Sequence, residues 1–191
     1  MSKGRMEAFS DGVLAIIITI MVLELRAPHE ATLAALRPLL PTLLSYTLSF
    51  LMLAIYWNNH HHLLQATHHV GGRVLWANMH LLFWLSLFPF GTAWMGATRF
   101  APLPVATYGA NLLMAGIAYF ILARALIALH GADSAIAQAL GRDFKGWVSI
   151  AVYALAVPLA FISAPLACML YALVAILWLI PDRRIERTLE R

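Results

Sequence analysis

The sequence predicts an all-α integral membrane protein with six transmembrane helices, and two observations lead to this fold class. The chain has 191 residues, of which 62% are hydrophobic and only 12% are charged. Soluble domains average about 45–50% apolar and about 25% charged residues, so this chain lacks the charge to cover a water-soluble surface. The charges are also uneven, because four runs contain no Asp, Glu, Lys or Arg: 38–72, 74–98, 100–123 and 146–181. The composition excludes an ordinary soluble enzyme, a disordered chain and a nucleic-acid-binding domain.

The charge-free runs define the expected transmembrane helices. A helix that crosses a bilayer needs about 20 apolar residues, and within lipid a helical bundle satisfies the backbone hydrogen bonds internally. The last run is long enough for two short helices, and a further apolar stretch lies near the N-terminus. We expect a single domain over residues 1–191, with helices at about 7–25, 37–57, 74–96, 103–129, 147–162 and 166–180.

Prolines and glycines mark the ends of the first two expected helices. The first is expected to end near Pro28, and Pro38 and Pro41 suit the first turn of the second. Polar residues after position 57 predict that the second helix continues as an extension to His69. The glycines at 71–72 are then expected to break it, because glycine is a poor helix former.

The remaining helices follow the same reasoning. The third fills the second charge-free run without an expected interruption. The fourth is opened by Pro102 and Pro104 and closed near Gly131. A tight turn at 163–165 joins the fifth and sixth helices, and the sixth is expected to stop at Pro181.

The Lys and Arg residues predict the orientation of the chain in the membrane. With the N-terminus inside, the inner side receives ten of them: Lys3, Arg5, Arg73, Arg124, Arg142, Lys145, Arg183, Arg184, Arg187 and Arg191. The outer side receives three, namely Arg26, Arg37 and Arg99. This asymmetry satisfies the positive-inside rule. We therefore expect a multi-pass protein of the cell membrane with both termini cytoplasmic.

The expected first helix carries an ionisable residue, Asp11, near its start. Such residues are costly in lipid, so they usually face the interior of a bundle or water. An alternative is that Ser10 or Asp11 caps a helix N-terminus, where a negative side chain meets the positive end of the helix dipole. The residues alone leave both interpretations open.

The same helix carries a stripe of branched apolar side chains with a single hydroxyl. At 100° per residue, its members fall within an arc of about 100°; they are Gly12, Ile16, Thr19, Ile20 and Leu23. Taken alone, such a stripe indicates helix–helix packing more often than a pore.

A motif on this helix resembles a known family. Arg5 and Phe9-Ser10-Asp11, followed by Gly-Val-Leu-Ala-Ile and Thr19, are similar to the first-helix signature of the transmembrane protein 175 family of lysosomal potassium channels. The likeness is to bacterial members, which have one six-helix unit per chain. Two further stretches resemble the family, Tyr56-Trp57 with His60 and His61, and Leu75-Trp76-Ala77-Asn78 with Pro89-Phe90. The resemblance is clear over the first half of the chain, and hydropathy alone extends it to the second.

The resemblance implies a potassium-permeable cation channel, a homotetramer in which the first helix of each subunit lines a central pore. The implied constriction is Ile16, with Ile20 and Leu23 as further pore-facing positions, and Thr19 with Ile16 is implied in selectivity. A polar network is implied to anchor the pore helix to the second and third helices. Its members would be Arg5, Phe9, Ser10, Asp11, Trp57, His60, His61 and Asn78.

The expected barrier to ions is apolar. The chain contains no Thr-Val-Gly-Tyr-Gly loop, so it cannot build a filter of backbone carbonyls of that kind. A ring of Ile16 side chains would instead exclude water and so block ions, and opening would widen the ring. The implied partners are potassium ions, the lipid bilayer and further copies of the chain.

The histidines between positions 60 and 69 offer rival functions. His61 and His68 are seven residues apart, as are His62 and His69, so each pair would share a helix face. Histidine pairs bind haem or metal when the geometry allows, but no matched pair lies on another expected span. The first alternative is therefore a haem- or metal-binding redox protein, and the second is a proton-coupled transporter that uses Asp11 with a histidine. We expect no metal, no cofactor and no enzymatic activity, since neither a nucleophile–base arrangement nor a carboxylate pair stands out.

Overall fold

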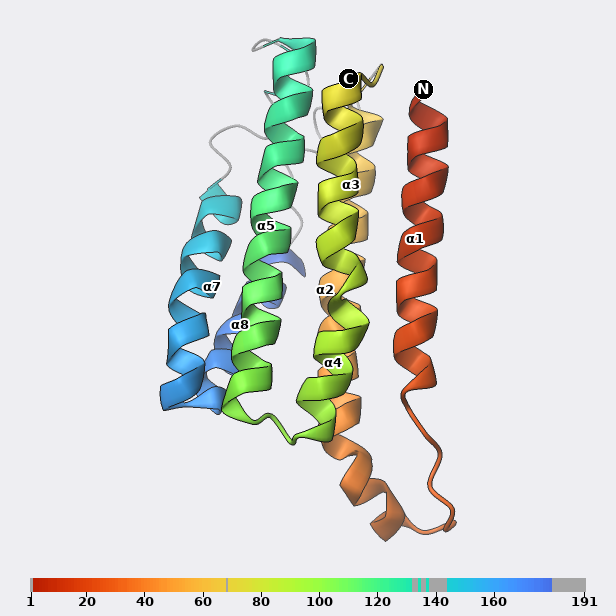
Figure 1. The fold of residues 1–191 in the computed structure, drawn as a ribbon, viewed down its shortest axis with the longest axis vertical. Helices are drawn as coiled ribbons and strands as arrows, with labels where there is room; N and C mark the ends of the chain where they lie inside the picture. The colour runs from red at the N-terminus through yellow and green to blue at the C-terminus, as the bar shows by residue number, and fades with distance from the viewer. Residues whose placement is uncertain (1, 68, 132–133, 135–136, 138–143, 180–191) are drawn as a thin grey trace.

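The structure, a computed structural model, describes residues 2–67, 69–131, 134, 137 and 144–179. These residues form helices and the loops between them, which confirms the all-α fold class. In chain order the elements are α1 (Lys3–Leu23), the 3-10 helix η1 (Leu33–Leu39), α2 (Leu40–Gln65), α3 (Gly72–Ser86), α4 (Phe88–Ala97), α5 (Pro102–His130), α7 (Phe144–Ile162) and α8 (Ala164–Leu179). Figure 1 shows the long helices side by side along the longest axis of the molecule.

Five helical stretches of the described residues are long and apolar enough to cross a membrane: Lys3–Leu23, Leu33–Gln65, Gly72–Ala97, Pro102–His130 and Phe144–Ile162. The sixth expected span, α8, is a shorter apolar helix of 16 residues. At 1.5 Å per residue such a helix is about 24 Å long, somewhat less than the roughly 30 Å hydrocarbon core of a bilayer. The chain is therefore a multi-pass membrane protein, and the described part of α8 is shorter than its five long apolar stretches.

The first helix begins earlier than expected, at Lys3 rather than at residue 7. An ion pair between Lys3 and Glu7, 3.7 Å apart on one face of the helix, supports this extra turn. The helix also ends earlier, at Leu23 rather than at residue 25. The earlier start follows from the charged residues of the first turn, which hydropathy does not detect, and the end differs from the expected one by two residues.

The third expected span is present over Gly72–Ala97, but two helices form it instead of the one uninterrupted helix expected over 74–96. α3 ends at Ser86, and α4 begins at Phe88 with Pro89 in its first turn. A proline has no backbone N–H and its ring clashes with the carbonyl four residues earlier, so the helix ends before it. In contrast, Pro158 lies inside α7 without ending it.

The second helix is also shorter than predicted, because it ends at Gln65 and not at His69. α3 starts at Gly72, and η1 precedes α2 as a separate 3-10 segment that contains Pro38. Several predictions fall on residues outside the described ranges: His68, the end of the last helix at Ile180 with the stop at Pro181, and the basic residues Arg142, Arg183, Arg184, Arg187 and Arg191.

α1 stands at one edge of the bundle and α7 at the opposite edge (Figure 1). α1 packs against α2, α3 and α4, whereas α5 packs against α7 and α3, and α8 packs against α7, α5 and α2. The starts of α1 and α3 and the end of α5 lie at the same end of the bundle, which we call the Lys3 end; we call the other the Leu23 end. Because its neighbours lie on one side only, α1 keeps a long face that none of the other described helices covers.

A glycine sets the close approach of α4 to α2, and we expect Gly96→Ala to destabilise the protein. A Cβ atom at Gly96 would lie 2.7 Å from Ser45 Oγ and 2.8 Å from Thr42 Cα, which is backbone of α2 and cannot rotate away. Overpacking of this kind costs about 1–3 kcal/mol. The measurement is thermal unfolding in detergent, followed by the loss of helical circular dichroism. Gly72→Ala is the control, because nothing lies within 4 Å of its Cβ position; equal melting temperatures for the two variants would contradict the packing argument.

Candidate functional site

The pore-facing stripe proposed from the sequence is exposed along α1. Ile16 is 59% exposed, Ile20 45% and Leu23 77%, and Gly12 and Thr19 are exposed as well. The opposite face of the helix is buried through residues spaced three or four apart: Met6, Ser10, Leu14, Ile17 and Met21. The stripe therefore does not pack within the chain, and it remains available for other copies or for a water-filled space.

A buried chain of hydrogen bonds ties α1 to α2 and α3 at the Lys3 end. Asn78 Nδ2 on α3 donates to Ser10 Oγ on α1 over 3.0 Å, and Asn78 Oδ1 lies 2.7 Å from His60 Nε2 on α2. All three side chains are at most 3% exposed. The Ser10 hydroxyl donates to the Met6 carbonyl at 2.8 Å, so Ser10 Oγ accepts from Asn78. Because the amide oxygen of Asn78 can only accept, His60 carries its proton on Nε2.

A second contact joins Asp11 to α2. Trp57 Nε1 donates to Asp11 Oδ1 over 3.0 Å, and the His61 ring stacks on Trp57 with 5.6 Å between centroids and 18° between planes. The alternative in which Ser10 or Asp11 caps a helix is wrong, because α1 begins at Lys3 and both residues lie well inside it. Their side chains bind neighbouring helices or an upstream carbonyl instead of the free amides of a first turn.

Two members of the expected network lie outside it. Arg5 is exposed and forms no ion pair with any residue that the structure describes, Asp11 included. Phe9 is 50% exposed and shares the uncovered side of α1 with Ile16. The structure thus brings together Ser10, Asp11, Trp57, His60, His61 and Asn78, and it leaves Arg5 and Phe9 directed away from the bundle.

Sequence reasoning missed a third set of polar contacts, near the Leu23 end. Ser49 on α2, Thr92 on α4 and Tyr108 on α5 are buried, and their hydroxyls are in hydrogen-bond contact with one another. The available signal was the presence of hydroxyl residues inside apolar spans, where polar groups must find partners within the protein. The sequence does not show which hydroxyls meet.

The histidines do not assemble a metal centre within the described part of the chain, where no group of three or more His, Cys, Asp or Glu side chains could hold an ion. The shared face expected of His62 and His69 does not form, because α2 ends at Gln65 between them. His69 instead lies against His130 at the end of α5, with 4.7 Å between ring centroids. The imidazole of His62 keeps a buried Nδ1 without a hydrogen-bond partner among the described residues.

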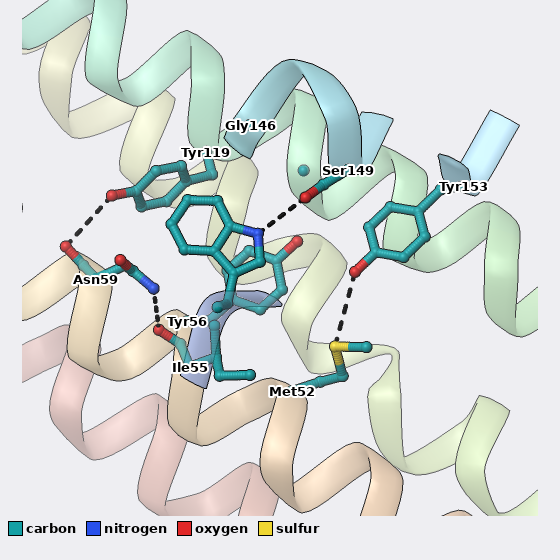
Figure 2. A pocket seen from close by; sticks show the side chains of 10 residues that line it. Met52, Ile55, Tyr56, Asn59, Tyr119, Gly146, Ser149 and Tyr153 are labelled. Atoms are coloured by element: carbon teal, nitrogen blue, oxygen red, sulfur yellow. Dashed lines mark hydrogen bonds between the residues drawn. The ribbon is translucent and has the colours of Figure 1, made fainter. Parts of the chain in front are cut away.

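A small pocket lies between α2, α5, α7 and α8, on the side of α2 turned away from α1 (Figure 2). Tyr56, Tyr119, Tyr153 and Trp178 form its aromatic walls, and Trp178 Nε1 donates to Ser149 Oγ over 2.8 Å. Its volume of about 40 Å³ exceeds the roughly 10–15 Å³ that a cavity needs to hold one water molecule. The pocket therefore accommodates water and not a haem.

Comparison with known proteins assigns the chain to a family. The model of the endosomal/lysosomal potassium channel TMEM175 matches residues 5–89, which run from the start of α1 through α3 and include all residues of the two contacts at the Lys3 end. A protein of Chryseobacterium sp. strain P1-3 named as a potassium channel is 53% identical over 190 residues, 100% of this chain and 99% of the relative. The chain belongs to the TMEM175 family.

Further relatives agree with this assignment to the TMEM175 family. A Streptomyces collinus protein, also named as a potassium channel, is 29% identical over 185 residues and covers 91% of this chain and 90% of its own. The crystal structure of a lysosomal potassium-selective channel TMEM175 homolog from Chamaesiphon minutus matches with a TM-score of 0.79 and 28% identity. That match covers 93% of this chain and 96% of the homolog. The comparisons thus extend the likeness beyond the first half of the sequence.

Proposed function

We propose that the protein is a potassium-permeable cation channel, a homotetramer whose four copies of α1 surround a pore with an apolar constriction at Ile16. The observation that carries the proposal is the uncovered apolar stripe on α1, the helix at the edge of the bundle. Relatives over the whole length are named as potassium channels, a class of transport proteins and not of enzymes.

A single copy of the chain does not enclose a pore. α1 has neighbours on one side only, and its uncovered side carries Ile16, Ile20 and Leu23. Four copies arranged about an axis beside α1 would turn these side chains toward one another, as closed rotational symmetry requires of identical interfaces. Tetramer formation would then create the pore and bury its apolar lining.

The barrier in such a pore is apolar because α1 places no charge on this stripe. Asp11 lies off the stripe and is held by Trp57, and Glu24 lies beyond the end of α1. A narrow ring of Ile16 side chains offers no hydrogen bonds to water, so it blocks ions while it stays dry. Opening requires that the four helices move apart at this level or rotate Ile16 out of the axis.

Thr19 supplies the polar group on the stripe. Its hydroxyl donates to the Ile16 carbonyl at 2.8 Å, so the proton is committed to the backbone and the oxygen lone pairs are left to accept. Four such oxygens would replace part of the water shell of a cation just beyond the constriction. Potassium loses its water more readily than sodium, so we expect a modest preference for potassium.

We propose the cell membrane as the location, with both termini cytoplasmic. The support is the Lys and Arg asymmetry of ten against three. In this orientation the Lys3 end of the bundle faces the cytoplasm and η1 faces outward. Labelling of single cysteines introduced at Lys3 and at Leu33 in intact cells with an impermeant reagent would test the orientation; modification of the cysteine at Lys3 and not of that at Leu33 would contradict it.

The deciding experiment measures cation flux from liposomes that contain the purified full-length chain. We expect saturating potassium flux to exceed sodium flux, with a tetramer detected by chemical cross-linking in the same membranes. Protein-free liposomes are the control. Absence of potassium flux from liposomes that contain the folded tetramer would contradict the channel, and a monomer in lipid would contradict the shared pore.

A further inference from the structure

The buried hydroxyls near the Leu23 end connect four helices through contacts that reach α1. Thr92 Oγ1 on α4 lies 2.6 Å from Ser49 Oγ on α2 and 2.6 Å from the Phe88 carbonyl oxygen. Ser49 Oγ lies 2.9 Å from the Tyr108 hydroxyl oxygen on α5. Thr92 Oγ1 also lies 3.6 Å from Met21 Sδ on α1. Thr92 on α4 therefore contacts α1 and α2 directly and is connected to α5 through Ser49.

The three hydroxyls satisfy one another. Ser49 Oγ donates to the Tyr108 hydroxyl, and the Thr92 hydroxyl lies within donating distance of both Ser49 Oγ and the Phe88 carbonyl oxygen. All three side chains are at most 4% exposed, so none of them can turn to water instead. The loss of the Thr92 hydroxyl would remove the polar contact between α4 and Ser49 and leave the bond between Ser49 and Tyr108.

Thr92 is itself held in a tight position. Gly96, one helical turn away, approaches the backbone of α2 so closely that a Cβ would lie 2.8 Å from Thr42 Cα. Gly91, the residue before Thr92, leaves room for the Tyr108 ring, since a Cβ there would lie 3.1 Å from Tyr108 Cδ2. α4 is thus packed against α2 and α5 on both sides of Thr92, which gives Thr92 a fixed place from which to contact α1.

Met21 transmits this position to the stripe. Met21 is 1% exposed, whereas Leu23 is 77% exposed, and two residues on an α-helix are about 160° apart around the axis. A shift of α4 against Met21 would therefore move Leu23 and the nearby Ile20 toward or away from the uncovered side of α1. The contacts of Ser10 with Asn78 hold the other end of α1, so Ile16 lies between two anchored points.

We propose that Thr92, held in place by Ser49 and Tyr108, is a positioning residue that sets the width of the pore at Ile20 and Leu23 and so the size of the cation that passes. This proposal rests on the proposed function. Thr92 does not touch the permeating ion; it acts through Met21 on the opposite face of α1. The hydroxyl is the functional group, because the methyl group of threonine has no part in the chain of hydrogen bonds.

The test compares two substitutions that separate the hydroxyl from the shape of the side chain. Thr92→Val keeps the shape and removes the hydroxyl, whereas Thr92→Ser keeps the hydroxyl. We expect Thr92→Val to change the ratio of caesium to potassium flux in liposomes by about threefold or more, and Thr92→Ser to restore the wild-type ratio. Thr98→Val is the control, since Thr98 at the exposed end of α4 bonds, among the described residues, to carbonyls of its own helix at 2.7 Å and 3.5 Å.

A second measurement needs no ion flux. The Leu23→Cys variant and the double variant Leu23→Cys/Thr92→Val are each reconstituted in lipid and oxidised. The rate of disulfide formation between subunits reports how closely the copies of α1 approach one another. We expect the rate to change when Thr92 is replaced by Val and to return with Thr92→Ser. Ser49→Ala, which removes the next hydroxyl, serves if Thr92→Val fails to fold, and it should shift both readouts in the same direction as Thr92→Val.

The outcomes separate this proposal from the proposed function. An unchanged flux ratio together with an unchanged disulfide rate in Thr92→Val would overturn the positioning role while the channel stands. The same shift in Thr92→Ser as in Thr92→Val would overturn the role of the hydroxyl. If the wild type conducts no potassium and Leu23→Cys forms no disulfide between subunits, the proposed channel and this inference fail together.

Discussion

Ile16→Asn is expected to raise resting potassium flux from liposomes by about tenfold or more, which corresponds to a barrier lower by about 1.4 kcal/mol. The physical reason is that four amide side chains at the constriction would hydrogen-bond to water and keep the pore wet. Ile16 is 59% exposed in the single chain and has no intrachain packing that the substitution would disturb deeply. The measurement is potassium efflux under the conditions in which the wild type is mostly closed.

Val22→Asn is the matched control for this prediction. Val22 is 44% exposed on the same helix, but at 100° per residue it lies about 120° around the axis from Ile16, outside the stripe. We expect this variant to retain the resting flux of the wild type. Equal flux in Ile16→Asn and in the wild type would place the constriction elsewhere, and the same increase in both variants would indicate a general leak instead of a gate at Ile16.

Asn78→Leu is expected to destabilise the protein by about 1–3 kcal/mol and to reduce potassium flux strongly. Asn78 bonds both Ser10 and His60, so leucine leaves the His60 Nε2–H without its acceptor and removes a donor from Ser10. Because all three side chains are buried, water cannot replace either bond without opening the packing. The free energy of unfolding is measured by denaturant titration in detergent, and flux is measured in liposomes at matched protein content.

Asn58→Leu provides the comparison for this loss. Asn58 is an exposed asparagine on α2, and no hydrogen bond of its side chain is found among the described residues. The same substitution there should leave both stability and flux near the wild-type values. If Asn78→Leu proved as stable and as active as Asn58→Leu, the buried chain from His60 to Ser10 would not anchor the pore helix.

The helix boundaries show which features of the fold can be predicted from local sequence signals. The spans themselves follow from charge-free runs, and the bundle has them within a few residues. The break between Ser86 and Phe88 was not predicted, although Pro89 is visible in the sequence. A proline inside an apolar run either ends the helix, as Pro89 does, or is tolerated within it, as Pro158 is in α7. Which of the two occurs depends on whether neighbouring helices bond the backbone carbonyls that the proline leaves free and pack against its ring.

Part of the candidate site also follows from local sequence signals, and part depends on the packing of the helices. The stripe on α1 follows from a period of 3.6 residues and is exposed along its length. The partners of Ser10 and Asp11 were proposed from a family resemblance, and the structure places Asn78 and Trp57 against them. Arg5 was grouped with them and lies apart. The pore roles of Ile16, Thr19, Ile20 and Leu23 stay predictions until flux is measured.

By itself, the sequence determined the membrane setting, the helical bundle and the apolar face of α1. These are properties of composition and of short-range periodicity, which each segment carries before it packs. Only the tertiary structure decided which polar side chains meet. Ser10 and Asn78 are 68 positions apart, and Thr92 is 71 positions from Met21. Their contact depends on how each helix is rotated about its axis, and a change of one residue turns a side chain by about 100° and breaks the pair.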